Sequence, residues 1–238
     1  DVRFAFDHLR PYEAELAASR VDRVDTYGKA MVTRFDNGMS IYSHNQLYGR
    51  WMIFETETEP KTNRSLRLSL VTETRKALLY SASEIEVLLG QADEDRHPFL
   101  SRLGPDLLTD DPSAAQIRAR LTSRTFCGRQ LAALLLDQRF VAGLGNYLRA
   151  DVLFKARVAP HLRGKDLDTR AQLRVCRAIR SLTHQSYETG GVTNDPKRVA
   201  RLKREGLSRR QYRHLVYKRE GQACWVCGTT IERQDLGG

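Results

Sequence analysis

Residues 134–154 read LLLDQRFVAGLGNYLRADVLF, which places two glycines and an asparagine between two helix-like apolar runs. We expect Gly143 and Gly145 to remove side chains where another backbone comes close, and Asn146 to lie where the second helix begins. The first amides of a helix lack intrahelical acceptors and carry a partial positive charge, so this bend can bind a phosphate. Taken alone, the pattern more often marks a plain turn with an asparagine cap.

The apolar spacing on both sides of the bend is helical. We predict four helices: over 113–122, over 129–138, from Asn146 onward, and from the capping-box-like Thr169-x-x-Gln172 to Gly190-Gly191.

The preceding part of the chain, residues 1–95, alternates in the manner of strands. Asn37-Gly38 supplies the positive φ of a tight hairpin turn, and a second hairpin turns near Glu73-Thr74. Short antiparallel strands at this spacing predict a sandwich or barrel. The predicted fold class is therefore α+β, with an antiparallel β-sandwich or barrel domain first and a helical domain second.

Breaks in these patterns divide the chain. His97-Pro98 and Gly104-Pro105 end any periodicity, so we place a domain boundary there. The resulting segments are a β domain at 1–95, a linker at 96–105, a helical domain at 106–195, and a basic segment with a cysteine pair at 196–238.

Length and composition exclude several classes of protein. A chain of 238 residues can bury a full apolar core. Its longest apolar runs, such as 131–136, are far shorter than the ~20 residues that a membrane span needs. The four cysteines do not form the pattern of a disulfide framework. We expect a cytosolic protein that makes no membrane contact.

Most of the net charge of +10 lies in one stretch. Between Lys197 and Arg219 there are ten lysines and arginines and one acid, Glu205. This stretch is either a solvated tail or a phosphate-binding surface. The interleaved Tyr212, His214 and Tyr217 favour the second interpretation, with nucleic acid as the partner.

Several motifs recur in the order found in one known family. DQRFVAGLGNYLRADVLF resembles the helix–two-turn–helix signature of the formamidopyrimidine-DNA glycosylase/endonuclease VIII family, and YGKAMVTRF and IYSHNQLYGRW resemble its β-domain motifs. HPFLSRLGPD and CWVC follow in the same order, so the resemblance covers nearly the whole chain. YSHNQLYG is most similar to bacterial endonuclease VIII.

This resemblance implies base excision repair of damaged double-stranded DNA. An enzyme of this family flips an oxidised base, mostly a pyrimidine, out of the duplex, breaks its glycosidic bond and nicks the strand by β,δ-elimination. The protein would thus be a bifunctional DNA glycosylase and apurinic/apyrimidinic lyase. We expect it to act as a monomer in the bacterial cytoplasm, on the nucleoid.

The resemblance also assigns roles to single residues in the β domain. Lys29 matches the lysine that contacts the damaged nucleotide and donates a proton during elimination. Gln46, Leu47 and Tyr48, expected at a hairpin tip, would fill the gap that a flipped base leaves in the stack. Without the flanking match, the same residues would be ordinary core contacts at a strand end.

Three more positions are matched to DNA contacts. Asn146, preceded by Gly145, matches the asparagine that clamps a phosphate, and Arg102 matches a DNA-contacting position in endonuclease VIII. An arginine in a linker is also consistent with a plain surface charge.

Cys224 and Cys227 form a C-x-x-C knuckle, which presents two thiolates to a metal but is also compatible with a redox or structural role. The family completes a structural zinc site with a second cysteine pair. Here 11 residues follow Cys227, so we predict half of a site for one structural zinc ion. His214 would substitute only after a rearrangement, and Cys127 and Cys176 lie in the helical region.

The resemblance leaves the nucleophile unassigned. The family uses the secondary amine of an amino-terminal proline followed by glutamate, whereas this sequence opens with DVRFAFDHLR and Pro11 is internal. We expect a fragment of a larger product with impaired catalysis, with attack by a Lys29 of depressed pKa as an alternative. The competing interpretations are a non-catalytic damaged-DNA-binding module and an RNA-binding protein.

Overall fold

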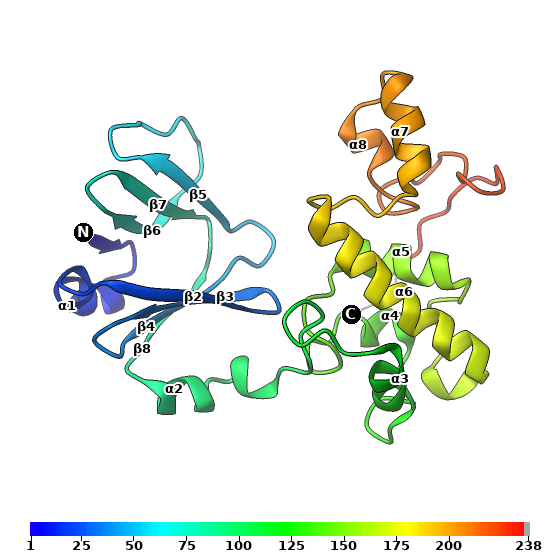
Figure 1. Ribbon diagram of the computed structural model, residues 1–238, viewed down its shortest axis with the longest axis horizontal. Coiled ribbons are helices and arrows are strands. Elements are labelled where there is room, and N and C mark those ends of the chain that lie inside the picture. The colour runs from blue at the N-terminus through cyan, green and yellow to red at the C-terminus, as the bar shows by residue number, and fades with distance from the viewer. Residues whose placement is uncertain (236–238) are drawn as a thin grey trace. The chain divides into compact units, whose positions relative to one another are not determined.

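The computed structural model describes residues 1–235, and the chain divides into two compact units, one from Asp1 to Arg102 and one that begins at Leu103 (Figure 1). The division falls inside the stretch expected to be a linker. Part of that stretch is packed rather than free, because the His97 and Phe99 rings lie against the buried ring of Tyr42, with centroids 4.1 and 6.2 Å away.

The first unit is a β-sandwich of two antiparallel four-stranded sheets, with strand orders β1-β6-β7-β5 and β2-β3-β4-β8. The strands are β1 (Val2–Phe4), β2 (Val21–Tyr27), β3 (Ala30–Phe35), β4 (Ser40–His44), β5 (Arg50–Glu55), β6 (Leu66–Val71), β7 (Arg75–Tyr80) and β8 (Glu84–Leu88). Phe35 and Ile41 from one sheet share a buried cluster with Leu68 and Leu79 from the other. The predicted α+β class is confirmed, and its β part is a sandwich.

Local turn chemistry explains the two predicted hairpins. Gly38 has φ +87° between β3 and β4, a conformation that favours glycine, and β6 and β7 pair around the second predicted turn. Four short helical elements were not expected: η1 (Asp7–Tyr12), α1 (Glu13–Ala17), α2 (Gln91–Arg96) and η2 (Leu100–Arg102). Leu9 and Leu16 anchor the first two in the sandwich core, and their spacing of seven follows helical turns, not strand alternation.

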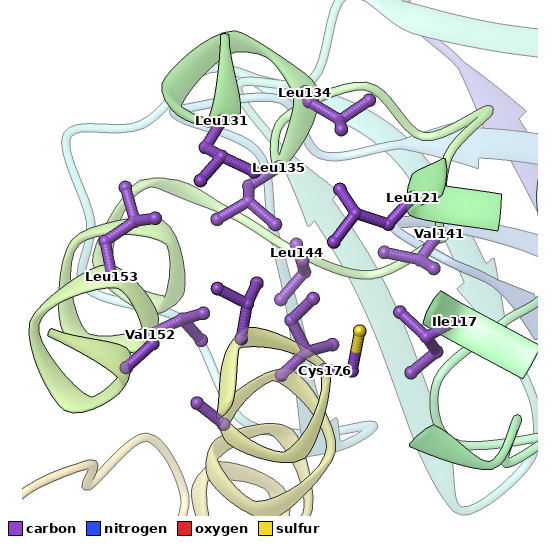
Figure 2. Packing of buried hydrophobic residues seen from close by; sticks show 14 of the residues in the cluster. Ile117, Leu121, Leu131, Leu134, Leu135, Val141, Leu144, Val152, Leu153 and Cys176 are labelled. Atoms are coloured by element: carbon purple, nitrogen blue, oxygen red, sulfur yellow. The ribbon is translucent and has the colours of Figure 1, made fainter. Parts of the chain in front are cut away.

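The second unit is helical. Its elements are α3 (Ala114–Thr122), α4 (Leu131–Leu134), α5 (Asn146–Ala156), η3 (Gly164–Asp166), α6 (Thr169–Glu188), α7 (Pro196–Arg204) and α8 (Arg209–Tyr212). One apolar cluster joins α3, α4, α5 and α6, and Figure 2 shows Ile117 of α3 beside Cys176 of α6 within it. In residues 1–235 no helix combines the length and apolar character needed to cross a bilayer.

Two predictions for this unit are wrong in detail, and one of two open interpretations is excluded. The helix expected over 129–138 is a single turn, because the Asp137 carboxylate accepts the backbone N–H of Arg139 (2.9 Å) and redirects the chain. The cap of α6 is Asp168, which accepts the N–H of Ala171, so the capping box at Thr169 does not form. The basic stretch is not a solvated tail, because it contains α7 and α8.

A buried carboxylate ties the parts of the second unit together. Asp151 of α5 is fully buried, and it accepts hydrogen bonds from the N–H groups of Leu215 (3.0 Å), Val216 (2.9 Å) and Tyr217 (3.1 Å) and from the hydroxyl of Thr193. The Nδ1 atom of His214 lies 3.6 Å away. Burial alone would raise the pKa of Asp151, but the hydrogen bonds outweigh it and hold the pKa below its ordinary value of 3.8.

Replacing Asp151 with Ala should destabilise the second unit by about 3–5 kcal/mol, because the donors around it lose their acceptor inside the protein. Since the folded-state pKa is lowered, the stabilisation is complete above about pH 4 and is lost as the pH falls through that pKa. Trp225 fluorescence in a Trp51→Phe background reports urea unfolding of this unit alone. The exposed Glu188→Gln change is the control, and a loss no larger than the control's would contradict the assignment.

Candidate nucleic-acid interface

The bend that opened the sequence lies between α4 and α5, and the conformation of Gly143 makes it possible. Gly143 has φ +103°, and a Cβ added there would meet no atom within 4 Å. The glycine is therefore needed for its backbone conformation and not, as expected, for a close approach. Gly145 is extended (φ −133°) and is the residue that caps α5.

Asn146 is not the predicted cap but the first residue of α5, and its side chain is exposed. Within residues 1–235, neither its side chain nor the N–H groups of Asn146, Tyr147 and Leu148 have an acceptor, and the first backbone bond of the helix is from Arg149 to Gly145 (2.8 Å). The plain-cap interpretation is wrong, and the helix start offers free donors with a partial positive charge.

Gln138 braces this bend from within, although the sequence did not single it out. Its Oε1 accepts the N–H of Gly143 (2.9 Å), while its Nε2 donates to the carbonyls of Leu136 (3.0 Å) and Leu144 (3.1 Å). The three residues that Gln138 contacts lie between positions 136 and 144, so this contact is local. The Asp137-Gln138 pair shortly before the glycines was the feature of the sequence that could have predicted it.

The two arginines that flank the bend have different roles. Arg139 is exposed and donates two side-chain hydrogen bonds to the Asp137 carboxylate. Burial of Asp137 would raise its pKa, but hydrogen bonds from Arg139 and Arg129 hold that pKa well below its ordinary value. Arg149 turns inward and donates to the Ala132 carbonyl (3.4 Å).

In the first unit, residues 45–49 form a tight loop that presents two large side chains. The loop joins β4 of one sheet to β5 of the other, so the expected hairpin tip is wrong. A Cβ on Gly49 would lie 2.5 Å from the Asn45 carbonyl oxygen, so only glycine fits there. Leu47 and Tyr48 are 80% and 73% exposed.

Side-chain contacts hold this loop open. Gln46 has φ +49°, its Nε2 donates to Glu84 (2.6 Å) and its Oε1 accepts from Ser83 (2.6 Å). Arg64 donates to the carbonyl of Tyr48 (2.6 Å). Gln46 thus stabilises the loop conformation, and the side chains of Leu47 and Tyr48 are exposed to solvent.

Lys29 lies at the same end of this sheet. It follows Gly28 in the β2–β3 turn, and its neighbour Ala30 pairs with His44, the last residue before the loop. Loss of water around the Lys29 ammonium lowers its pKa below 10.5, although part of the side chain remains exposed. His44 Nδ1 lies 3.2 Å from Glu84; burial lowers the pKa of His44, the Glu84 charge opposes this and the Lys29 charge adds to it.

Arg102 ends the first unit, on η2. Its side chain is exposed and makes no hydrogen bond or ion pair within residues 1–235. Arg102 is thus available to a ligand. The same exposure is also consistent with a plain surface charge.

The cysteine pair lies in a short hairpin of the second unit. The N–H of Val226 donates to the Cys224 sulfur (3.4 Å), and the Thr229 contacts lower the pKa of the exposed Cys227 thiol. These two sulfurs suit half of a tetrahedral zinc site, but nowhere in the described residues do three potential metal ligands gather. His214 is buried against Asp151 and does not contribute.

Protein contacts also fix this hairpin. The buried Arg219 guanidinium stacks on the Trp225 ring at 3.8 Å and donates to the carbonyls of Leu215 and Ala223 (both 2.7 Å). Burial of Cys176 in the core raises the pKa of its thiol to about 12, so this residue is no metal ligand.

Comparisons with known proteins agree with this geometry. Residues 103–197 match the family model described as the formamidopyrimidine-DNA glycosylase H2TH domain. Endonuclease 8 of Salmonella paratyphi B is 42% identical over 236 residues, covering 99% of this chain and 86% of that protein, and Endonuclease 8 of Salmonella arizonae has the same identity and coverage.

The fold also matches a solved structure. Lactococcus lactis formamidopyrimidine-DNA glycosylase, bound to DNA containing an abasic site, has a TM-score of 0.79 at 17% identity, over all of this chain and 86% of that one. At 17% identity the structural similarity shows the fold alone. The 42% identity to the Salmonella protein shows the family. The chain therefore belongs to the formamidopyrimidine-DNA glycosylase/endonuclease VIII family.

Proposed function

We propose that this protein is a base-excision-repair DNA glycosylase with apurinic/apyrimidinic lyase activity on oxidised bases, mostly pyrimidines, in duplex DNA. Family membership supports the reaction class. The observation that carries the proposal is the loop at 45–49, which exposes Leu47 and Tyr48 to water at the end of the sheet where Lys29 lies. Its place of action would be the bacterial nucleoid, where the protein would act as a monomer.

Each part of the proposed interface has a physical task. The free donors at the start of α5, with the Asn146 amide, would hold a phosphate and so fix the register of the duplex. Leu47 would enter the stack where a base has been flipped out, and burying one leucine is worth about 1.5–3 kcal/mol. Arg102 would add a backbone contact, and Gln46 would keep the loop in shape.

Elimination then needs proton transfers. An amine attacks C1′ of the sugar, the C1′–N bond breaks, and the base leaves with that electron pair and takes up a proton. The sugar ring opens to give the Schiff base, a C2′ proton then leaves, and the 3′ phosphate departs with the C–O electron pair. The family resemblance gives the attacking amine to an amino-terminal proline and the proton donor to Lys29. A lowered pKa suits an acid of this kind, because the proton is released more readily near neutral pH.

Zinc in this proposal is structural only. Cys224 and Cys227 would supply two of its four ligands and thereby stiffen the hairpin that carries them. None of the steps at the sugar depends on the ion.

Replacing Lys29 with Ala should slow nicking of abasic-site DNA by about 10²-fold or more, because a general acid is removed. The alkaline limb of the rate should lie below pH 10.5 in the wild type and move upward in Lys29→Arg, which keeps the charge but holds its proton. Borohydride trapping on abasic-site and thymine-glycol duplexes measures the Schiff base. Salt-sensitive binding with no wild-type adduct would instead indicate the non-catalytic binding module.

Replacing Leu47 with Ala should weaken discrimination between abasic-site and intact duplex by about 1.5–3 kcal/mol, because the wedge no longer fills the gap. Affinity for intact duplex should change little. Fluorescence anisotropy on both duplexes gives the ratio, and Leu66→Ala, at an exposed leucine on β6, is the matched control. Equal losses on both duplexes would disprove the wedge role, and tighter binding of structured RNA would favour an RNA-binding protein.

Replacing Gln138 with Ala should weaken binding of damaged and intact duplex by the same factor, on the order of tenfold, since phosphate contacts carry no lesion information. The bend loses the hydrogen bonds that join Gln138 to Gly143, Leu144 and Leu136. Asn146→Ala should give the same pattern, and the double variant should lose less than the sum, because both changes act on one contact. Unchanged affinity in Gln138→Ala would refute the bracing role.

A further inference from the structure

Helices α7 and α8 form a small, well-packed appendage of the second unit. Figure 1 shows them side by side beyond the end of α6. Their own apolar cluster contains Val199, Leu202 and Tyr212, and the Asn194 side chain donates to the Tyr212 carbonyl (2.8 Å). Thr193, just before α7, bonds to Asp151 of α5. The side chains on this appendage are therefore held in fixed positions on the body of the unit.

The outer surface of this appendage is cationic and almost free of acidic partners. Six exposed cations lie on it: Lys197, Arg201, Lys203, Arg204, Arg209 and Arg210. Within the described chain, Arg201 has an ion pair with Glu205 (3.6 Å), and none of the other five has one. Arg209 donates to the Gly190 carbonyl and Lys203 lies over the Tyr212 ring, which leaves Lys197, Arg204 and Arg210 without a partner.

The packing of α7 decides which polyanion suits this surface. A helix that binds a lipid surface inserts its apolar face into the bilayer interface. Here that face is unavailable, because Val199 and Leu202 are only 9% and 2% exposed. Charge without apolar surface suits the phosphates of a nucleic acid instead.

The start of α7 also lies at a distance from the bend at Asn146. Lys155, in the last turn of α5, lines one cavity with Asp195 and Pro196 at the start of α7. The bend at Asn146 is at the opposite end of α5, roughly 15 Å away at 1.5 Å per residue. That length corresponds to about four phosphates of one strand at ~3.4 Å each.

We propose that the cationic surface of α7 and α8 binds phosphates of duplex DNA flanking the lesion, as a second backbone contact beyond the bend at Asn146. This inference rests on the proposed function for its duplex. The contact would raise affinity for all duplexes alike and extend the length of DNA that the protein covers.

A charge-removal variant tests this proposal. Lys197, Arg201, Arg204 and Arg210 are each changed to Gln, which keeps helix propensity. The control changes four other exposed cations of the same unit to Gln: Arg124, Lys165, Arg170 and Arg177. Both variants lose the same net charge, and Trp225 fluorescence verifies that each has folded. Anisotropy titrations use abasic-site and intact duplexes, long or trimmed close to the lesion, over a range of salt.

The α7–α8 variant should lose affinity on long duplexes, on the order of tenfold or more, with a salt slope smaller by about 0.9 for each phosphate contact removed. The loss should be equal on damaged and intact DNA and should vanish on trimmed duplexes. An unchanged slope, or the same loss in the control, would overturn the proposal. So would unchanged DNA binding together with cation-dependent binding to phosphatidylserine vesicles or to an acidic peptide. Normal salt slopes without lesion preference in the wild type would instead count against the glycosylase proposal alone.

Discussion

The Asp151 carboxylate is the constraint on which the second unit depends. A buried charge is tolerated only when its surroundings satisfy it, and here three consecutive backbone amides and a hydroxyl do so. These donors come from the segments that lead into α7 and into the cysteine hairpin. One carboxylate on α5 thus fixes the helix that starts at Asn146, the cationic appendage and the hairpin relative to one another.

In the loop at 45–49 of the first unit, Gln46 makes the hydrogen bonds that fix the loop, and Leu47 and Tyr48 remain exposed. Gln46 is bound on both of its polar ends, which costs side-chain freedom, and this lets Leu47 and Tyr48 remain in water without collapsing onto the sheet. Glu84 serves two neighbours, since it accepts from Gln46 and lies against His44. The loop shape and the electrostatic surroundings of Lys29 are therefore set by the same short strand end.

Short sequence motifs correctly predicted the elements whose conformation depends on a few adjacent residues. Asn37-Gly38 gave its hairpin and the start of α5 fell at Asn146, because turn conformation and helix starts depend on a few adjacent residues. The buried role of Asp151 was missed because its donors lie far along the chain. The apolar spacing did not register the local turn at Asp137 that ends α4, and the charge of the basic stretch hid the small apolar cluster on which its helices pack. Asn146, expected as a cap, was found with a free side chain, and only the backbone geometry distinguishes the two.

The stacking of Arg219 on Trp225 has a consequence for metal loss. The hairpin that carries the two sulfurs is fastened to the body by a cation–π contact and by carbonyl bonds, none of which passes through a sulfur atom. If the proposed zinc binds to Cys224 and Cys227, its chelation would loosen the tip of this hairpin and leave its base folded. Loss of the proposed zinc and unfolding of the helical scaffold would therefore be separate events.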